Sequence, residues 1–378
     1  MGRLKKKITQ PKYRKLHDTW ALISSSLGNK ALQTTQHEKI IHQSNVIAAS
    51  KTKNKNLIET DFYLSSPDGF YTQSPVDLYE LKNIWMTGAQ GHLFFDQKNY
   101  LHICPSFDGI SDKKIRRPIP ALAQRIKNPV FILTGRGLGN RGHFLVEHLP
   151  RFLACRNFIP SDTKIMVPPK QKRWAKEYLA KLGISEDMII EGSEGTILLE
   201  QAFYMPLFSN DEKARLAPKE FYQQLRDAFI QPSSRPRESI FISRKDADLR
   251  LMLNEDEIFD MAKSRFPDLR KVSMSALSLD EQIALFANAE LVIGAHNQAF
   301  RNLMFCSGAL CIQLVNGERC EQNEYYFWAN NYSQLGTLFD NGCISLYSET
   351  PLDSDWNWTY PSDKFSKDLD RVINCWEK

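Results

Sequence analysis

The sequence predicts an α/β protein with parallel sheets, divided into two domains. The chain has 378 residues, well above the usual domain size of about 100–150 residues. Short apolar runs alternate with helical patterns of about 8–12 residues, and this alternation is typical of βαβ units. Proline and charged residues gather at 211–218 and again at 231–237, which indicates a domain boundary in this region.

We therefore expect four regions along the chain. Residues 1–57 are polar and basic, and they predict a partly disordered arm with at most one helix. Residues 58–215 form the predicted N-terminal domain, and residues 216–350 form the C-terminal domain. Residues 351–378 predict a C-terminal segment with a helix near 366–376.

Apolar runs in the N-terminal domain predict its strands, at residues 62–64, 92–95, 101–104, 129–133, 164–167, 189–190 and 202–205. One helix is expected to begin near His143, directly after a glycine-rich stretch. A second is expected over residues 172–182, where Gly183 closes it.

The alternation is clearer in the C-terminal domain. Strands are predicted at residues 239–243, around Val272, at 291–294 and at 311–315. Helices are predicted at residues 221–229, 254–263 and 298–305. Ser278 and Glu281 have the spacing of a capping box, which predicts the start of a helix that runs to Ala289.

Composition and cysteine usage indicate a soluble protein of the reducing cytoplasm. Hydrophobic residues make up 42% and charged residues 25% of the chain, which allows a core of normal size. The formal net charge of +5 is too small to predict nucleic acid as a partner. The seven cysteines are odd in number and contain no Cys-x-x-Cys pair, so we expect reduced thiols.

The positive charge is concentrated at the start of the chain. Seven cations and no acidic residue occur in the first 17 residues: Arg3, Lys5, Lys6, Lys7, Lys12, Arg14 and Lys15. Such an arm is either a solvated tail or a contact to an anionic membrane surface, where each cation contributes about 1 kcal/mol. We expect no signal peptide, because no apolar stretch follows the arm, and no transmembrane helix, because no apolar run of about 18 residues occurs. The predicted location is cytoplasmic, with peripheral contact to the inner membrane as the alternative.

Three strand-to-helix turns carry candidate functional residues, because open parallel sheets bind ligands at the carboxyl ends of their strands. The first turn lies within residues 135–151 and is rich in glycine. His143 and Glu147 follow it, four residues apart on one helix face. They could act as a general base and its partner. Arg136, Asn140, His148 and Arg151 are the other polar residues of interest there. A structural or solvated role is the alternative for each.

The second turn follows the predicted strand at 239–243. Arg244, Lys245 and Arg250 lie in it, and guanidinium groups can bind the oxygens of a diphosphate through paired hydrogen bonds. The alternative is a solvated loop, in which Asp246 and Asp248 balance the charge.

The third turn follows the predicted strand at 291–294. His296 lies where a helix begins, and the free N–H groups of a helix start favour a phosphate. His296 could bind or protonate a leaving group there, or it could merely cap the helix. No pair of aspartates ends a strand in an apolar setting, so we predict a site that needs no metal ion and no other cofactor.

Together, these segments resemble family 61 of the glycosyltransferases, whose bacterial members occur with capsular and exopolysaccharide genes. The resemblance covers roughly residues 130–318. The N-terminal motif is Gly142-His143-Phe144-Leu145-x-Glu147-x-Leu149-Pro150-Arg151. The C-terminal motifs are Phe241-Ile242-Ser243-Arg244 with Ala247 and Arg250, Asn254-Glu255, Ser278, Glu281-Gln282, Phe286, Val292-Ile293-Gly294-Ala295-His296 and Asn302-Leu303-x-Phe305.

The resemblance implies a GT-B-like fold, with two Rossmann-like parallel-sheet domains and a cleft between them. It implies inverting transfer from a nucleotide-sugar donor to a growing surface polysaccharide or other glycan. Glu147, or His143 oriented by Glu147, would be the base. The donor would bind in the C-terminal domain, at Arg244, Arg250, His296, Asn297, Gln298 and Glu318. The acceptor would approach Arg136, Asn140, His148 and Arg151, and the C-terminal helix would cross back onto the N-terminal domain.

One departure from the family pattern lies directly after His296. The family has His-Gly-Ala-Gly there, whereas this chain reads His296-Asn297-Gln298-Ala299-Phe300. The loss of two glycines places amide side chains near the expected diphosphate. This predicts either a changed donor or a non-catalytic, glycan-binding relative that acts as a scaffold.

An NAD-linked oxidoreductase is a further alternative, since it also has Rossmann-like domains and a glycine-rich turn. It requires the dinucleotide fingerprint and an acidic residue about 20 positions further on. Gly135, Gly137 and Gly139 do not have the required spacing, and basic and aromatic residues follow them.

Overall fold

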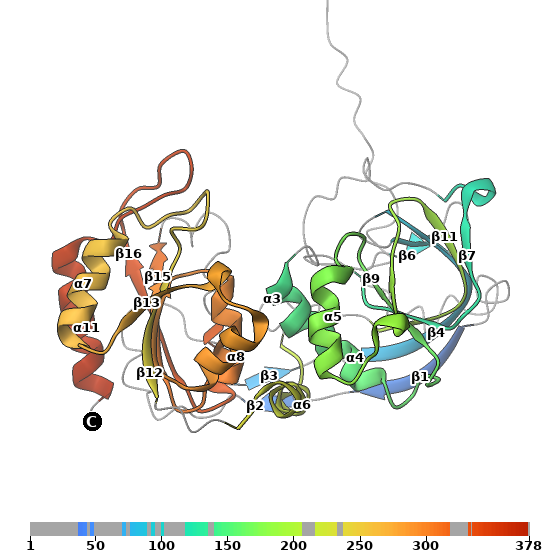
Figure 1. Cartoon of the computed structure of the whole chain (residues 1–378), viewed down its shortest axis with the longest axis horizontal. Coiled ribbons are helices and arrows are strands. Elements are labelled where there is room, and N and C mark those ends of the chain that lie inside the picture. Colours follow the sequence, from blue (N-terminus) through green and yellow to red (C-terminus); the bar gives the residue numbers. More distant parts are fainter. Residues whose placement is uncertain are drawn as a thin grey trace, which may run out of the picture.

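The computed structural model describes residues 37–43, 46–48, 70–72, 76–88, 92–94, 100–101, 118–134, 140–205, 216–232, 237–317, 332–333 and 335–376. Residues 1–17 of the basic arm and the strand expected at 62–64 lie outside these ranges. Within them the chain forms two large sheets with helices between and around them (Figure 1). The predicted α/β class is confirmed, and the C-terminal sheet is parallel as expected, but the N-terminal sheet contains antiparallel strands as well.

The N-terminal sheet is mixed. Within the described ranges it has nine strands, and its main path runs β10-β9-β8-β11-β4-β5-β6. The parallel part contains β10 (Ile189–Glu191), β9 (Lys164–Val167), β8 (Val130–Ile132) and β11 (Thr196–Tyr204). The antiparallel part contains β4 (Val76–Thr87), β5 (His92–Phe94), β6 (Tyr100–Leu101) and β1 (His37–Gln43), while β7 (Gln124–Ile126) pairs with β11 in parallel. Strands β2 (Val46–Ala48) and β3 (Phe70–Thr72) pair separately.

The helical segments of this half follow its parallel strands. After β8 come α3 (Arg141–His143), a π-helical turn η4 (Phe144–His148) and α4 (Leu149–Cys155). Helix α5 (Lys172–Lys181) follows β9, and the short helix η5 (Glu186–Met188) leads into β10. The short helix η3 (Pro120–Leu122) precedes β7.

The C-terminal sheet is parallel throughout, with the order β13-β12-β14-β15-β16. Its strands are β12 (Glu238–Ser243), β13 (Arg270–Ser273), β14 (Ala289–Ala295), β15 (Leu310–Asn316) and β16 (Gly342–Ser348). Numbered along the chain, this is the doubly wound order 2-1-3-4-5, whose switch point lies between the first and third strands. A ligand site is therefore expected where β12 and β14 end.

Helices cover both faces of the C-terminal sheet because its apolar residues alternate between two clusters. Ile240 and Ile242 of β12 join the cluster shared with α8 (Leu279–Ala287) and η7 (Gln298–Phe305), whereas Phe241 points to the other face. That second face packs against α7 (Glu255–Arg265) and α11 (Ser362–Trp376). β12 and β14 approach so closely at Gly294 that a Cβ there would lie 2.8 Å from the Ile242 carbonyl oxygen. Only glycine fits.

Helix α6 (Lys219–Phe229) connects the two sheets (Figure 1). Its Tyr222 hydroxyl donates to the carbonyl of Val146 at 3.0 Å, on the N-terminal side. Its Arg226 donates to the carbonyls of Met304 and Cys306, where η7 ends. The buried apolar cluster continues from α4 through α6 to η7 and α8. The relative position of the two sheets is thus held by packing.

Most predicted elements of the second half are confirmed, including the capping box of Ser278 and Glu281 at the start of α8. The C-terminal helix forms, but it does not cross back onto the N-terminal domain as expected. It packs on α7, where Arg265 pairs with Asp370 at 2.9 Å. The amphipathic sequence of this helix predicts that one face is buried, but it does not predict which part of the protein covers that face. Within the described ranges, none of the helices has the length and apolar character needed to span a membrane.

Strand β4 was not predicted, for a local reason. The regular alternation of β4 is interrupted at Asn83, whose φ of 51° is not that of a strand residue. The buried residues Leu78, Leu81 and Ile84 are consequently three apart, a spacing that resembles a helix more than a strand. Strands β1 and β2 also fall within the region expected to be a loose arm.

We predict that Asn341 is a main polar support of the C-terminal core. Its buried amide donates to the carbonyls of Gly336, Leu303 and Cys306 and accepts from the Ala309 N–H. Asn341→Ala should lower the free energy of unfolding by about 2–4 kcal/mol, because buried backbone groups lose their partners. Urea denaturation measures this. The exposed Asn157→Ala is the matched control, and an equal loss in both variants would contradict the prediction.

Candidate functional site

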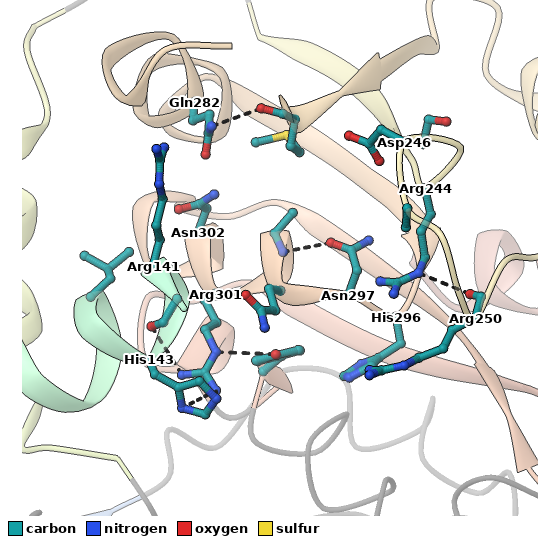
Figure 2. A pocket seen from close by; sticks show the side chains of 18 of the residues that line it. Arg141, His143, Arg244, Asp246, Arg250, Gln282, His296, Asn297, Arg301 and Asn302 are labelled. Carbon is teal, nitrogen blue, oxygen red and sulfur yellow. Dashed lines mark hydrogen bonds between the residues drawn. The ribbon is translucent and has the colours of Figure 1, made fainter. Parts of the chain in front are cut away.

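A cavity of about 700 Å³ opens where β12 and β14 end, at the switch point of the C-terminal sheet. Residues of the N-terminal half, from α3, η4 and α5, line its other side. Figure 2 shows Arg141 and His143 on one side and Arg244, Arg250 and His296 on the other. The ionisable groups among the described lining residues are mostly basic: Arg141, His143, Arg244, Asp246, Asp248, Arg250, His296 and Arg301. Such a lining favours an anionic ligand.

Arg244 is held at the cavity by a buried carboxylate. Its backbone N–H donates to Glu255 Oε2 at 2.8 Å, and the Ser243 hydroxyl donates to Glu255 Oε1 at 2.6 Å. Glu255 itself is only 1% exposed. The Arg244 guanidinium folds over its own loop, where Nε donates to the Arg250 carbonyl at 3.1 Å. The end of β12 and the loop that follows it are therefore fixed together.

Arg250 has an unusual backbone conformation. Its φ of 65° lies in the left-handed region, which non-glycine residues adopt rarely. The Arg250 N–H donates to the carbonyl of Asp355 at 3.1 Å, so the loop is held from both sides. Backbone strain of this kind gathers at functional loops.

His296 lies at the end of β14, and two neighbours fix its ring. Nδ1 is 2.9 Å from Gln313 Oε1, an oxygen that can only accept, so Nδ1 carries the proton. Gln313 Nε2 in turn donates to the Ser333 hydroxyl, which orients the amide. The ring stacks on Tyr332, with centroids 4.8 Å apart and planes at 19°.

Asn297, and not His296, caps the helix that follows. Asn297 Oδ1 accepts from the Ala299 N–H at 2.7 Å, and Nδ2 donates to the Ala295 carbonyl at 2.7 Å. One of the N–H groups that η7 could offer to a phosphate is therefore used by the protein itself. Asn297 and Gln298 both line the cavity.

His143 and Glu147 face each other across the turn of α3 and η4. His143 Nδ1 is 2.7 Å from Glu147 Oε1. The carboxylate accepts, so Nδ1 carries the proton. His143 lines the cavity, while Glu147 lies behind it with its side chain 5% exposed. The turn is π-helical, a rare distortion that is frequent at functional sites.

Arg301 of η7 completes this cluster from the other sheet. Its Nη1 donates to Glu147 Oε1 at 2.9 Å, and its Nη2 lies 3.2 Å from His143 Nδ1 and 3.4 Å from Nε2. The guanidinium carbon lies 5.3 Å from the centre of the Tyr332 ring. Tyr332 thus lies against both His296 and Arg301, on the two sides of the cavity.

The charges of the cluster determine the state of Glu147. Burial alone would raise its pKa, but the opposing effects of His143 and Arg301 are larger and hold the pKa of Glu147 well below its usual range. The carboxylate is therefore ionised at neutral pH, with both partners bound to one of its oxygens.

The structure places the remaining predicted residues away from the cavity or outside the described ranges. Asn140 caps α3 by accepting from the Gly142 N–H at 2.8 Å. Arg151 is buried, where it donates to the carbonyls of Met205 and Ile132 and lies 2.8 Å from His148. None of these three is among the described residues that line the cavity. Arg136 and Glu318 lie outside the described ranges.

The sequence interpretation gave no role to Arg301 or Tyr332. Arg301 lies five residues after His296 in the third turn, and a cation so close to a strand end was an available signal. No sequence pattern pointed to Tyr332.

No group of three or more His, Cys, Asp or Glu side chains in the described part of the chain could hold a metal ion. Metal independence stays a prediction.

We predict that Glu147 makes stability depend on acid pH. At neutral pH, Glu147→Gln should lower the free energy of unfolding by about 3–5 kcal/mol, because the buried Arg301 loses its counter-charge. A lowered pKa stabilises the fold above the ordinary value of 4.5, and this contribution is lost as the pH falls below it.

The difference between wild type and Glu147→Gln should therefore shrink from about pH 5 to pH 3, as measured by urea denaturation. Glu194→Gln is the control, since its ion pair with Lys170 is exposed; its effect should stay below about 1 kcal/mol at every pH. A difference for Glu147→Gln that is independent of pH would contradict the prediction.

Comparison with known proteins finds a family match for part of the chain. Residues 142–312 match the model of a family described as Glycosyltransferase 61. No curated protein matches the chain. The matched range contains His143, Arg244 and Arg250, which line the cavity, and Glu147, which lies behind His143. The match supports a transferase, and it supports the assignment of this region to glycosyltransferase family 61.

Proposed function

We propose that the chain transfers a sugar from a nucleotide-sugar donor to a hydroxyl of a glycan acceptor, with inversion at the anomeric carbon. The observation that carries this proposal is the position of His143. Its imidazole lies across one cavity from Arg244 and Arg250, at the switch point of a parallel sheet. A base and a set of leaving-group cations on opposite sides suit a single displacement.

The donor diphosphate would bind at the β12 side. Arg244 and Arg250 follow that strand, and guanidinium groups bind phosphate oxygens through paired hydrogen bonds. As the bond between the anomeric carbon and the diphosphate oxygen breaks, negative charge grows on the nucleoside diphosphate. Fixed cations stabilise that charge without reorganising. This is why we propose a metal-independent reaction.

His143 is the better candidate for the base. Glu147 lies behind the cavity, and its oxygen Oε1 already accepts from Arg301 and His143. The proton of the acceptor hydroxyl would move to His143 Nε2 as the acceptor oxygen bonds to the anomeric carbon. Glu147 stabilises the resulting imidazolium through Nδ1, as the carboxylate of a catalytic triad does.

The finer features follow from the family resemblance and remain part of the proposal. They are a GT-B-like arrangement with the donor on the C-terminal side, and an acceptor that belongs to a bacterial surface polysaccharide. We also propose a cytoplasmic location, with the basic arm against the inner membrane.

A second candidate is a non-catalytic protein that binds glycans. The observation that favours it is the Asn297 side chain, which uses the Ala299 N–H at the start of η7. A phosphate that needs this group would bind weakly.

Donor turnover separates the two candidates. With a panel of uridine, guanosine, cytidine and thymidine nucleotide sugars, we expect one class to be hydrolysed slowly without acceptor, and equally with EDTA. His143→Ala should lower this rate by about 10²–10⁴-fold, because a general base is lost. Release of free nucleotide measures it, and Lys176→Ala is the control, since Lys176 is not among the described residues that line the cavity. No turnover and no nucleotide binding would favour the glycan-binding candidate.

Arg244 should contribute mainly to binding of the donor. Arg244→Ala should weaken nucleoside diphosphate binding by about 10–100-fold, since a charge-assisted hydrogen bond contributes about 1.5–3 kcal/mol. Calorimetric titration measures this. Arg156→Ala removes an exposed arginine elsewhere and serves as the matched control. Equal affinities in the two variants would contradict the proposed donor position.

A further inference from the structure

We infer that Arg301 is a positioning residue for sugar transfer, which holds the His143 imidazole in place through Glu147. The inference deepens the proposed function and rests on it for its kinetic part. It concerns a contact that the motifs do not contain, since Arg301 reaches Glu147 from the other sheet.

The guanidinium of Arg301 is occupied by protein groups. Nη1 donates to Glu147 Oε1 at 2.9 Å and lies 3.3 Å from the Gly142 carbonyl, and Nε donates to the Tyr332 hydroxyl at 3.4 Å. The residue is only 2% exposed. Although it borders the cavity, its described polar contacts are with α3, η4 and Tyr332, and Nη2 lies 3.2 Å from His143 Nδ1, so its effect on a substrate would pass through His143.

Gly142 provides the space that Arg301 needs. A Cβ at this position would lie 2.4 Å from Arg301 Cδ and 3.2 Å from Asn140 Oδ1. Because Arg301 is buried, a methyl group at residue 142 would force its side chain out of the observed position. The glycine before His143 is thus explained by close packing against a residue 159 positions further along the chain.

Stability alone does not account for the ion pair. The cost of desolvating two buried charges largely offsets their attraction, and an apolar pair of similar volume is often as stable. A guanidinium donates its hydrogen bonds in a fixed, planar geometry, so it can fix the orientation of the carboxylate that it binds. With Arg301 bound to Glu147 Oε1, the carboxylate has one orientation, and so does the imidazole that donates to the same oxygen.

Three variants separate positioning from folding. Arg301→Lys keeps the positive charge but loses the planar set of N–H donors of the guanidinium. Gly142→Ala keeps every polar group and displaces Arg301. The double variant Arg301→Met with Glu147→Gln removes both charges, so that no buried charge is left alone. Arg301→Met alone is its reference, and Asn157→Ala is the surface control.

Two readouts are needed. The first is the steady-state rate with the donor identified by the nucleotide-sugar panel. Arg301→Lys and Gly142→Ala should each lower kcat by about 10–100-fold, with donor KM within about 3-fold of wild type, because misplacing a catalytic group affects the chemical step. The double variant should melt well above Arg301→Met and yet stay as slow as Arg301→Lys.

The second readout does not require turnover. ¹⁵N NMR of histidine-labelled protein, with His143 assigned by His143→Gln, reports the tautomer of the ring. Wild type should show the proton on Nδ1, and Arg301→Lys and Gly142→Ala should show a mixture of tautomers. If no donor is turned over, the proposed function fails while this readout still tests the positioning role. Wild-type kcat, or an unchanged tautomer, in folded Arg301→Lys and Gly142→Ala would overturn the inference.

Discussion

The arrangement of the site depends on one buried ion pair, between Arg301 of η7 in the C-terminal half and Glu147 of η4 in the N-terminal half. Both side chains are almost fully buried, and breaking such a pair costs about 3–5 kcal/mol. Helix α6 and a continuous apolar cluster hold the two sheets at the distance that this pair requires. The strand ends of one sheet and the imidazole of the other are therefore kept at a single cavity.

The two sides of the cavity obtain their rigidity differently. On the β12 side, a buried carboxylate, Glu255, binds the strand end, and backbone contacts hold the loop from Arg244 to Arg250. On the other side, His143 depends on a charge network and a π-helical turn. Tyr332 contacts both parts, since it lies against His296 and against Arg301. A loop that provides cations and a network that orients a base are the two components that the proposed displacement requires.

Features determined by local sequence could be predicted, and features determined by tertiary packing could not. The strand ends at Ser243 and Ala295 and the i,i+4 pair of His143 and Glu147 follow from short-range patterns. The contact of Arg301 with Glu147 spans 154 positions of the chain, and no periodicity encodes it. His148 and Arg151 had the same motif signal as His143, but they lie on the helix face that turns into the core. The irregular backbone of β4 at Asn83 and the surface that α11 covers were likewise not encoded in a local pattern.

The central claim is that one cavity binds the donor diphosphate at the end of β12 and presents it to His143. A crystal structure of the protein with a bound nucleoside diphosphate tests this most directly. We expect phosphate oxygens within hydrogen-bonding distance of the Arg244 and Arg250 guanidinium groups, with the terminal phosphate directed towards His143 and the Arg301–Glu147 pair intact. A diphosphate bound away from both arginines, or one that displaces Arg301 from Glu147, would contradict it.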